Sequence, residues 1–418
     1  MRVTFLTHYY PPEVGAPQTR ISALASGLAA RGVEVAVHAP PPHYPDGRIP
    51  AGYRNRLFEA ESTEPVGVVR SAVLPAPNRG FARRLADHAS FGASAVATAG
   101  RAPAADVVVV ESPPLFTAGA AIAYARRKRA RLVLNVADMW PDSAIELGAL
   151  RSDLAIRAAR RLERRVYRRS AAIVCPTEGI EARLGARPDA AGKVTRIPPA
   201  VDVAAFESAD PPGSDAFRVL YAGTTGMAQG MGTLLEAAAA LQGDGVEVTI
   251  AGDGAEGGTV RARAAALPNV SALGTVPHDR VPLLLAESDA AVVLLRDQPL
   301  FEGALPTKLL EAMAAARPVV LSARGEAARL LEASGGGVVV PPEDPAALAA
   351  ALRELAGAQD RALRMGKAGR RFVSERHSRA GFVESWLGLL DRVAGQTPPS
   401  FPEEAGAMTP PVQPGDRV

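Results

Sequence analysis

Residues 217–242 read FRVLYAGTTGMAQGMGTLLEAAAALQ, and this stretch joins an apolar run, a glycine-rich turn and a helix-length segment. The apolar run, residues 217–221, is typical of a buried strand. Residues 231–242 have the composition of a helix. A strand followed directly by a helix is the repeating unit of a parallel sheet, so the stretch predicts an α/β domain that starts near residue 213.

The same alternation of short apolar runs and helix-length segments continues on both sides of this stretch. It is typical of a parallel sheet with helices on both faces. We therefore predict an α/β protein of two Rossmann-like, doubly wound domains, residues 1–200 and 213–378, whose ligand-binding edges face each other across a cleft. The predicted strands are residues 2–7, 34–39, 106–110, 132–136, 171–175, 217–221, 246–251, 270–273, 290–294, 318–321 and 337–340, and the predicted helices include residues 19–30, 115–128, 231–242, 306–315 and 345–355.

Two further segments follow the second domain. Residues 379–394 have a helical pattern, and we predict that this helix crosses back to the first domain. Residues 395–418 are rich in proline and hold too few apolar residues to bury a core, which predicts a disordered tail.

Length and composition narrow the class of protein. A chain of 418 residues exceeds one ordinary core, and two domains of about 200 residues are the natural expectation. The single cysteine, Cys175, forms no intramolecular disulfide, which fits a reducing cytosol. The N-terminus lacks the features of a signal peptide, and no uncharged apolar run reaches the roughly 18 residues that span a bilayer. We expect a cytoplasmic protein whose only membrane contact is peripheral.

Charge is divided unevenly along the chain. Residues 1–200 carry 28 Lys and Arg against 17 Asp and Glu, whereas the remainder carries 19 against 27. Seven arginines recur at helical spacing opposite an apolar stripe, which predicts an amphipathic helix with a basic face. No aromatic platform or DNA-binding motif accompanies this charge, so nucleic acid is not an expected partner. The arginines are Arg157, Arg160, Arg161, Arg164, Arg165, Arg168 and Arg169.

This basic face has two interpretations of similar weight. It is a solvated surface in an arginine-rich protein, or it contacts anionic lipid on the inner face of the plasma membrane. In the second case residues 79–91, through apolar side chains such as Phe81 and Phe91, are the segment expected to insert at the surface.

Glycine-rich turns follow several predicted strands at the ligand-binding edge. Residues 221–230, YAGTTGMAQG, allow the backbone to approach a ligand and offer N–H groups to an anion such as phosphate. Gly252 ends the next strand at the same edge. Gly15 lies in a comparable turn before the first helix, where an ordinary loop is an equally good interpretation. The turn around Gly15 holds no G-x-G-x-x-G motif, which argues against a nicotinamide dinucleotide fold.

A late motif, residues 300–313, reads LFEGALPTKLLEAM and begins a helix after the predicted strand 290–294. Lys308 and Glu311 are three residues apart, so they share a helix face. They form either a simple intrahelical ion pair or a ligand contact, in which Lys308 neutralises a diphosphate and Glu311 accepts hydrogen bonds from ribose. The position at the ligand-binding edge favours the ligand contact.

Taken together, the motifs resemble glycosyltransferase family 4, whose members are retaining enzymes of the GT-B fold. Within it the chain is most similar to the N-acetyl-fucosaminyl transferases of colanic-acid and O-antigen synthesis. The resemblance runs in family order from Thr7 to about Leu352. Its segments are HYYPPEVGAPQTR, PPHYPDGRI, DMWPDSAIELGAL, YAGTTGMAQGMGTLLEAA, AGDG, LPTKLLEAMAAARPVV and VVVPPEDPAAL.

The resemblance implies transfer of a sugar, with retention, from a nucleotide-sugar donor, above all a UDP-sugar, to a glycan acceptor, above all a lipid-linked one, in cell-surface polysaccharide synthesis. It places the donor on the second domain and the acceptor on the first. It implies no cofactor and no metal, because basic side chains and helix N-termini stabilise the departing diphosphate. The residues carried over are Gly15, which faces the donor phosphates or the acceptor; Gly223, Thr224, Thr225, Gly226, Gln229 and Gly252 around the phosphates; Val276 and Pro277 at the base; and Lys308 and Glu311 at the diphosphate and ribose.

The chain departs from the family pattern at two places. The first glutamate of the family's Glu-x7-Glu pair would fall at Gly303, and Glu302 is one residue out of register. Thr225 and Gln229 lie in the stretch where the family carries an arginine and a lysine. The positive charge on the donor side therefore rests more heavily on Lys308, with Arg296 or Arg20 as further sources.

The predicted catalytic residues are Lys308, Glu311 and Asp138. No obvious nucleophile is present, so we favour front-face transfer over a covalent glycosyl-enzyme. Asp138 follows a predicted strand of the first domain and is the leading candidate to orient or deprotonate the acceptor. Asp142 is the second candidate, with helix capping as its alternative role.

Other functions remain open for such a chain. The acceptor can be a soluble natural product instead of a lipid-linked glycan. A sugar-nucleotide epimerase shares the fold and would need no acceptor. A non-catalytic partner subunit, which the missing basic pair allows, would bind nucleotide without turnover.

Overall fold

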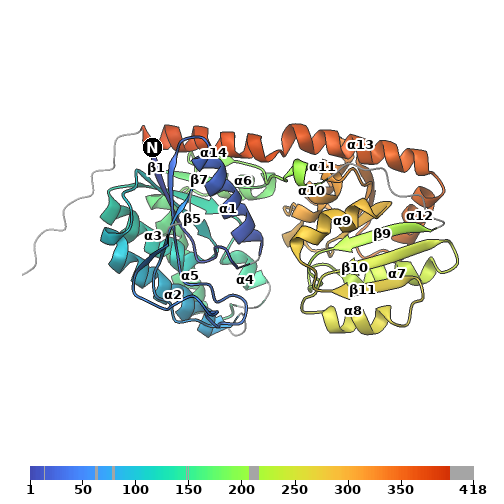
Figure 1. Ribbon diagram of the computed structural model, residues 1–418, viewed down its shortest axis with the longest axis horizontal. Coiled ribbons are helices and arrows are strands. Elements are labelled where there is room, and N and C mark those ends of the chain that lie inside the picture. Colours follow the sequence, from blue (N-terminus) through green and yellow to red (C-terminus); the bar gives the residue numbers. More distant parts are fainter. Residues whose placement is uncertain are drawn as a thin grey trace, which may run out of the picture.

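The computed structural model describes residues 1–13, 15–61, 65–77, 81–146, 148, 150–206 and 216–395. The described chain forms two α/β domains that lie side by side and are joined along one side by the last two helices (Figure 1). Two segments remain, the Pro-rich residues 208–215 between the two predicted domains and residues 396–418 of the predicted tail. Both lie outside the described residues.

The N-terminal domain is built on an eight-stranded sheet of order β3-β4-β2-β1-β5-β6-β7-β8. Its neighbouring strands are parallel except β3 and β4, which pair antiparallel at one edge. The predicted strands do not include β3, β4 and β8; β3 and β8 are three residues long and their sequences, EAE and VTR, contain no apolar run. The strands are β1 (Arg2–Leu6), β2 (Glu34–Ala39), β3 (Glu59–Glu61), β4 (Gly67–Arg70), β5 (Val107–Ser112), β6 (Arg131–Val136), β7 (Ala172–Cys175) and β8 (Val194–Arg196).

Helices cover both faces of this sheet, so its central strands are buried on both sides, whereas the edge strands β3 and β8 are partly exposed. Along β1, Val3 and Phe5 enter the core beneath α1, whereas Leu6 enters the core beneath α2 and α3. This alternation follows from the two-residue period of a strand. The helical elements of this domain are α1 (Ala16–Ala29), α2 (Phe81–Thr98), η1 (Ala99–Arg101), α3 (Leu115–Lys128), α4 (Asp142–Glu146), α5 (Asp153–Arg169) and α6 (Glu178–Gly185), whereas the next one, η2 (Val203–Ala205), packs on the C-terminal domain.

The C-terminal domain contains a six-stranded parallel sheet of order β11-β10-β9-β12-β13-β14. The strand order reverses beside β9, and ligands of doubly wound sheets bind at the carboxyl end of such a reversal. The strands are β9 (Phe217–Ala222), β10 (Val246–Ala251), β11 (Val270–Gly274), β12 (Ala290–Leu294), β13 (Val319–Ser322) and β14 (Gly337–Val340); the helical elements are α7 (Met231–Ala240), α8 (Gly257–Ala264), η3 (His278–Arg280), α9 (Val281–Ala286), η4 (Pro299–Phe301), α10 (Thr307–Ala314), α11 (Gly325–Ser334) and α12 (Pro345–Ala356).

The last two helices, α13 (Gln359–Arg376) and α14 (Arg379–Ala394), run along one side of both domains (Figure 1). α13 packs on the C-terminal domain, whereas α14 crosses to the N-terminal domain. There Val383, Trp386 and Leu390 are buried in the same core as β1 and α1. The chain therefore returns to its first domain, and the two domains are linked by two separate crossings.

A second contact joins the domains at α6. The carboxylate of Glu326, on α11, accepts hydrogen bonds from the backbone N–H groups of Glu178 (3.0 Å) and Gly179 (3.2 Å). A negative charge at a helix N-terminus is favourable because the free N–H groups there carry partial positive charge. Gly179 also lies against Gly303 so closely that an added Cβ would be 3.0 Å from the Cα of Gly303. The domains thus touch at one end of the space between them.

Candidate functional site

Two adjoining cavities occupy the space between the domains. The smaller has a volume of about 530 Å³ and the larger about 710 Å³. Both are lined by residues from the two domains and by Phe382 of α14. Because the cavities share lining residues, they form one continuous cleft. The shared residues are Arg20, Pro199, Gln229, Thr307 and Phe382.

The turn after β9 forms part of the smaller cavity and is shaped by Gly223. This residue has φ +144°, a conformation that side-chain-bearing residues rarely adopt. An added Cβ would lie 2.8 Å from Nζ of Lys308. A side chain at position 223 would therefore collide with Lys308, and glycine is required there for Lys308 to enter the cavity.

Lys308, in the first turn of α10, is fixed by Tyr221 at the end of β9. Its Nζ donates a hydrogen bond of 2.8 Å to the Tyr221 hydroxyl and lies 4.5 Å from the centre of the Tyr221 ring. The hydroxyl in turn donates to the carbonyl of Thr224 at 2.6 Å. Burial lowers the pKa of Lys308 to about 8, although nearby Glu311 acts in the opposite direction. Lys308 is therefore a preorganised cation with few competing partners.

Glu311 lines the same cavity one turn further along α10. Its Oε1 lies 3.2 Å from Nε2 of His278, and this hydrogen bond raises the pKa of His278. His278 is more than half exposed, so the pair lies at the mouth of the cavity. A ligand hydroxyl that reaches Glu311 would meet both an acceptor and a donor.

The other predicted donor-side residues divide into those that reach the cavity and those that do not. Thr225 is completely buried, and the backbone N–H of Gly252 bonds Gly274 of the sheet. The N–H of Gly226 donates to the side chain of Gln229 at 3.1 Å, so Gly226 shapes the turn. Val276 and Pro277 directly precede His278 but are not among the lining residues of the smaller cavity. Those that line it are Gly15, Gly223, Thr224, Gln229, Lys308 and Glu311.

Asp138 follows β6 and lines the larger cavity. One of its oxygens accepts a hydrogen bond of 2.8 Å from the hydroxyl of Ser143, which holds the carboxylate in place. Asp142 differs, because its carboxylate lies 3.4 Å from Arg160 and 3.6 Å from Arg183. Asp142 is thus engaged in ion pairs, and Asp138 is the carboxylate that an incoming group would meet.

Of two further residues at the cleft, Arg20 was predicted only as a further source of positive charge, and Tyr221 was not predicted. Arg20, on α1, lines both cavities and is held by Glu111, with 2.6 Å between Nη2 and Oε1. Of the two further cations named above, Arg20 is therefore the one that reaches the cleft, whereas Arg296 pairs with Glu256. Tyr221 was missed because it reads as an ordinary strand residue, and only the fold brings it to Lys308.

Family comparison covers both domains. Residues 15–200 match the family model described as glycosyl transferase 4-like domain, and residues 216–357 match the one described as glycosyl transferases group 1. The chain belongs to glycosyltransferase family 4. Its two facing doubly wound domains are those of the GT-B fold, so the family and fold that the motifs predict are confirmed.

Individual relatives agree with this assignment. The glycosyltransferase is 26% identical over 335 residues to WcaI of Escherichia coli K12, named as a colanic acid biosynthesis glycosyl transferase, and the match covers 75% of this chain and 81% of WcaI. Sucrose-phosphate synthase from Thermosynechococcus elongatus superposes with a TM-score of 0.72 at 17% identity, over 94% and 98% of the two chains. Anabaena HepE in complex with UDP-glucose gives 0.67 at 16% identity, over 94% and 100%. At these identities the two structures establish the fold.

Proposed function

We propose that the protein transfers a sugar, with retention, from a UDP-sugar in the smaller cavity to a glycan acceptor in the larger one, in the synthesis of a surface polysaccharide. The observation that carries the proposal is Lys308, a partly buried cation held by Tyr221 beside the bare backbone of Gly223. Support for the donor comes from HepE, which was solved with UDP-glucose, and support for the product class comes from WcaI.

In this proposal the C-terminal domain binds the donor and stabilises the leaving group. Lys308 and the N-terminus of α10 face the diphosphate, whose negative charge increases as the glycosidic bond breaks. Such preorganised charge is worth more in a water-poor cleft than in bulk solvent. Glu311 accepts from the ribose hydroxyls. No metal contacts the diphosphate, because these groups supply the positive charge.

The N-terminal domain presents the acceptor. Asp138 lies in the larger cavity, which adjoins the smaller one at Arg20 and Gln229. We assign to Asp138 the orientation of the acceptor hydroxyl and the removal of its proton. The hydroxyl approaches from the side on which the diphosphate departs, which gives retention without a covalent intermediate.

Nucleotide binding and product stereochemistry test this function. Calorimetry with UDP, GDP and ADP is expected to give the lowest Kd for UDP. Incubation with a UDP-sugar and lipid-linked acceptors is expected to give a product whose anomeric coupling in proton NMR matches that of the donor. A lower Kd for GDP or ADP would change the proposed donor nucleotide but not the proposed reaction. If none of the three nucleotides bound, the proposal would be contradicted.

The pH dependence of UDP binding follows from Lys308. Lys308 must carry its proton to attract a diphosphate, and its pKa is about 8. Below pH 8 it is already charged, so the Kd is expected to be flat. Above pH 8 each bound UDP must bring in a proton, and the Kd is expected to rise toward tenfold per pH unit. Calorimetry between pH 7 and 9.5 measures this.

The matched control for this dependence is Lys308→Arg, whose guanidinium stays charged across that range. The Kd of this variant for UDP is expected to be higher than the wild-type Kd at pH 7, because the contact with Tyr221 changes. It is expected to stay constant from pH 7 to pH 9.5. An equal rise of Kd with pH in both proteins would assign the dependence to another group.

We also propose that the acceptor is lipid-linked and that the basic face of α5 contacts anionic lipid. Among the described residues, Arg160 is the one of the seven arginines on α5 that forms an ion pair, so most of the charge is free. Leu154 on the same helix is 72% exposed and can enter the lipid surface. No helix within the described ranges has the length and apolarity required to cross a membrane.

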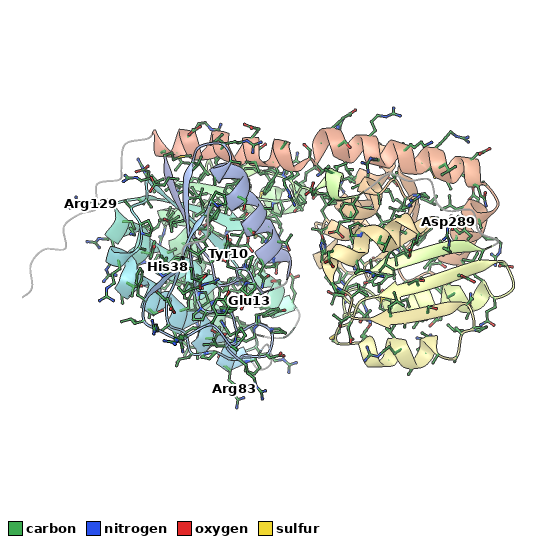
Figure 2. All side chains as sticks on the ribbon, in the orientation of Figure 1. Tyr10, Glu13, His38, Arg83, Arg129 and Asp289 are labelled. Carbon is green, nitrogen blue, oxygen red and sulfur yellow. The ribbon has the colours of Figure 1, made fainter. Side chains whose placement is uncertain are left out.

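The predicted insertion of residues 79–91 needs correction. Phe91 is completely buried and packs against the rings of His8 and His38, because α2 covers a face of the sheet. Arg79 and the side chain of Phe81 lie outside what the structure describes. Arg83 remains exposed and projects outward from the edge of the domain (Figure 2).

Vesicle binding tests the basic face of α5. Replacing Arg160, Arg164 and Arg168 by glutamate reverses charge on one face and spares the apolar stripe. The variant is expected to lose co-sedimentation with anionic vesicles while it binds UDP normally. Wild-type binding is expected to weaken strongly with salt, because the screening length falls from about 10 Å at 0.1 M to about 3 Å at 1 M.

The matched control reverses three exposed basic residues on α13, Arg364, Lys367 and Arg371, which gives the same change of net charge on the other domain. Binding of this control is expected to stay close to wild type. Equal loss in both variants, or equal binding to neutral and anionic vesicles, would show that α5 is only a solvated face and would favour a soluble acceptor.

A further inference from the structure

Three polar side chains meet in the interior of the N-terminal domain, outside the cleft. They are His8, which follows β1, His43, which follows β2, and Asp87 of α2. Their side chains are at most 6% exposed. None of them lines the two cleft cavities. Neither the proposed transfer reaction nor the packing of the core accounts for two imidazoles and a carboxylate at one buried point.

The geometry of the three groups is that of ligands around a common centre. Nε2 of His8 lies 3.3 Å from Oδ1 of Asp87, and Nε2 of His43 lies 3.1 Å from Oδ2. One donor atom from each residue can be chosen so that all lie within 4.8 Å of one another. Ligands at about 2.1 Å from a tetrahedral ion are separated by about 3.4 Å. The two measured separations are close to that value.

His8 makes fewer hydrogen bonds than its two ring nitrogens allow, and a bound ion would contact one of these nitrogens. Both of its ring nitrogens are buried and without a hydrogen-bond partner among the described residues, although Asp87 is near. A buried polar atom without a partner is uncommon in a native fold and calls for a ligand or an ion. Two side chains that bind the same metal lie close together without a hydrogen bond between them, because each directs its donor atom at the metal and not at the other side chain.

His43 is oriented for the same purpose. Its Nδ1 lies 2.8 Å from the carbonyl of Pro41, so Nδ1 carries the proton and donates it. Its Nε2 faces Asp87 and hydrogen-bonds that carboxylate, with 3.1 Å to Oδ2, so a bound ion would take the place of the proton between them. A backbone carbonyl behind a histidine is the usual support of a metal ligand, because it fixes both the ring orientation and the tautomer. The loop of His43 is itself held by Glu13, whose Oε1 accepts from the N–H groups of His43 (2.7 Å) and Tyr44 (2.8 Å).

We propose that His8, His43 and Asp87 bind a divalent transition metal, with Zn²⁺ as the preferred ion, and that this ion holds together the three segments that carry them. Two imidazoles and one carboxylate suit Zn²⁺ and related ions, whereas Mg²⁺ and Ca²⁺ prefer oxygen ligands. The ion lies apart from the diphosphate, so it acts on the stability of the N-terminal domain and not on the leaving group.

Metal content of the tag-free protein tests the proposal. After growth or refolding with Zn²⁺, we expect one equivalent to remain through gel filtration and to raise the Tm. Substitution by Co²⁺ is expected to give the visible absorption of a low-coordinate nitrogen and oxygen site. X-ray absorption at the zinc edge is expected to show two imidazoles. Absence of retained metal, or a bound ion without imidazole ligands, would overturn the proposal without any variant.

Variants assign the ion to its ligands. His43→Gln and Asp87→Asn are expected to lose the retained equivalent and the absorption. The matched controls are His88→Gln, a buried neighbour whose Nε2 lies 3.3 Å from the hydroxyl of Tyr9, and His278→Ala, an exposed histidine of the other domain. Both controls are expected to keep the metal. Retention in both ligand variants, or loss in His278→Ala, would place the ion elsewhere and refute the assignment.

Discussion

Lys308→Ala is expected to lower the transfer rate by about 10²- to 10³-fold, which is the usual effect of removing one preorganised group that stabilises negative charge in the transition state. Affinity for UDP is expected to fall by roughly 10- to 100-fold, because a hydrogen bond to a charged group contributes about 1.5–3 kcal/mol. The fold is expected to persist, since the Tyr221 hydroxyl keeps its bond to Thr224. Calorimetry and initial rates measure both effects.

Two comparisons make this result specific to the site. Arg263→Ala removes a cation from the same domain that pairs with Glu236 at the surface, and it is expected to leave both quantities unchanged. Glu311→Ala is expected to weaken the binding of UDP and to leave the affinity for pyrophosphate, which has no ribose, unchanged. Normal UDP affinity and turnover in Lys308→Ala would remove Lys308 from the site.

Asp138→Asn is expected to bind the donor normally and to lose about 10²- to 10⁴-fold in transfer rate, the range typical of general acid–base catalysis. The amide keeps the shape of the carboxylate and can still bond Ser143, so the melting temperature is expected to change little. Steady-state rates with a saturating donor, together with calorimetric UDP titration and thermal unfolding, separate these effects.

Asp142→Asn is the matched comparison, because Asp142 is the second candidate and is engaged with Arg160 and Arg183. It is expected to turn over at nearly the wild-type rate and to lose a little stability. If Asp142→Asn lost its transfer rate and Asp138→Asn kept it, Asp142 would be assigned as the base instead. A large drop in the melting temperature of Asp138→Asn would instead show a structural role.

The sequence alone determined most strands of both sheets, all but β3, β4 and β8, and, through the motifs, the family. The helix predicted at residues 115–128 is α3 (Leu115–Lys128), and the strand predicted at 246–251 is β10 (Val246–Ala251). Such segments are readable because the burial of one helix face or of a whole strand imposes a local period on the sequence. The glycine turns and the Lys308 motif were likewise recognisable, because turns and helix starts need particular residues.

Only the tertiary structure decided which of these residues meet. Tyr221 and Lys308 are 87 residues apart and come together because β9 lies next to β12, after which α10 begins. Thr225 and Phe91 resemble ligand and membrane contacts in sequence, yet both are completely buried. The order of the strands and the meeting of side chains from distant loops at the sheet edge depend on contacts between distant segments. A local pattern carries no record of those contacts, so the pairing of Tyr221 with Lys308 in the cleft and the buried cluster of His8, His43 and Asp87 appear only in the folded chain.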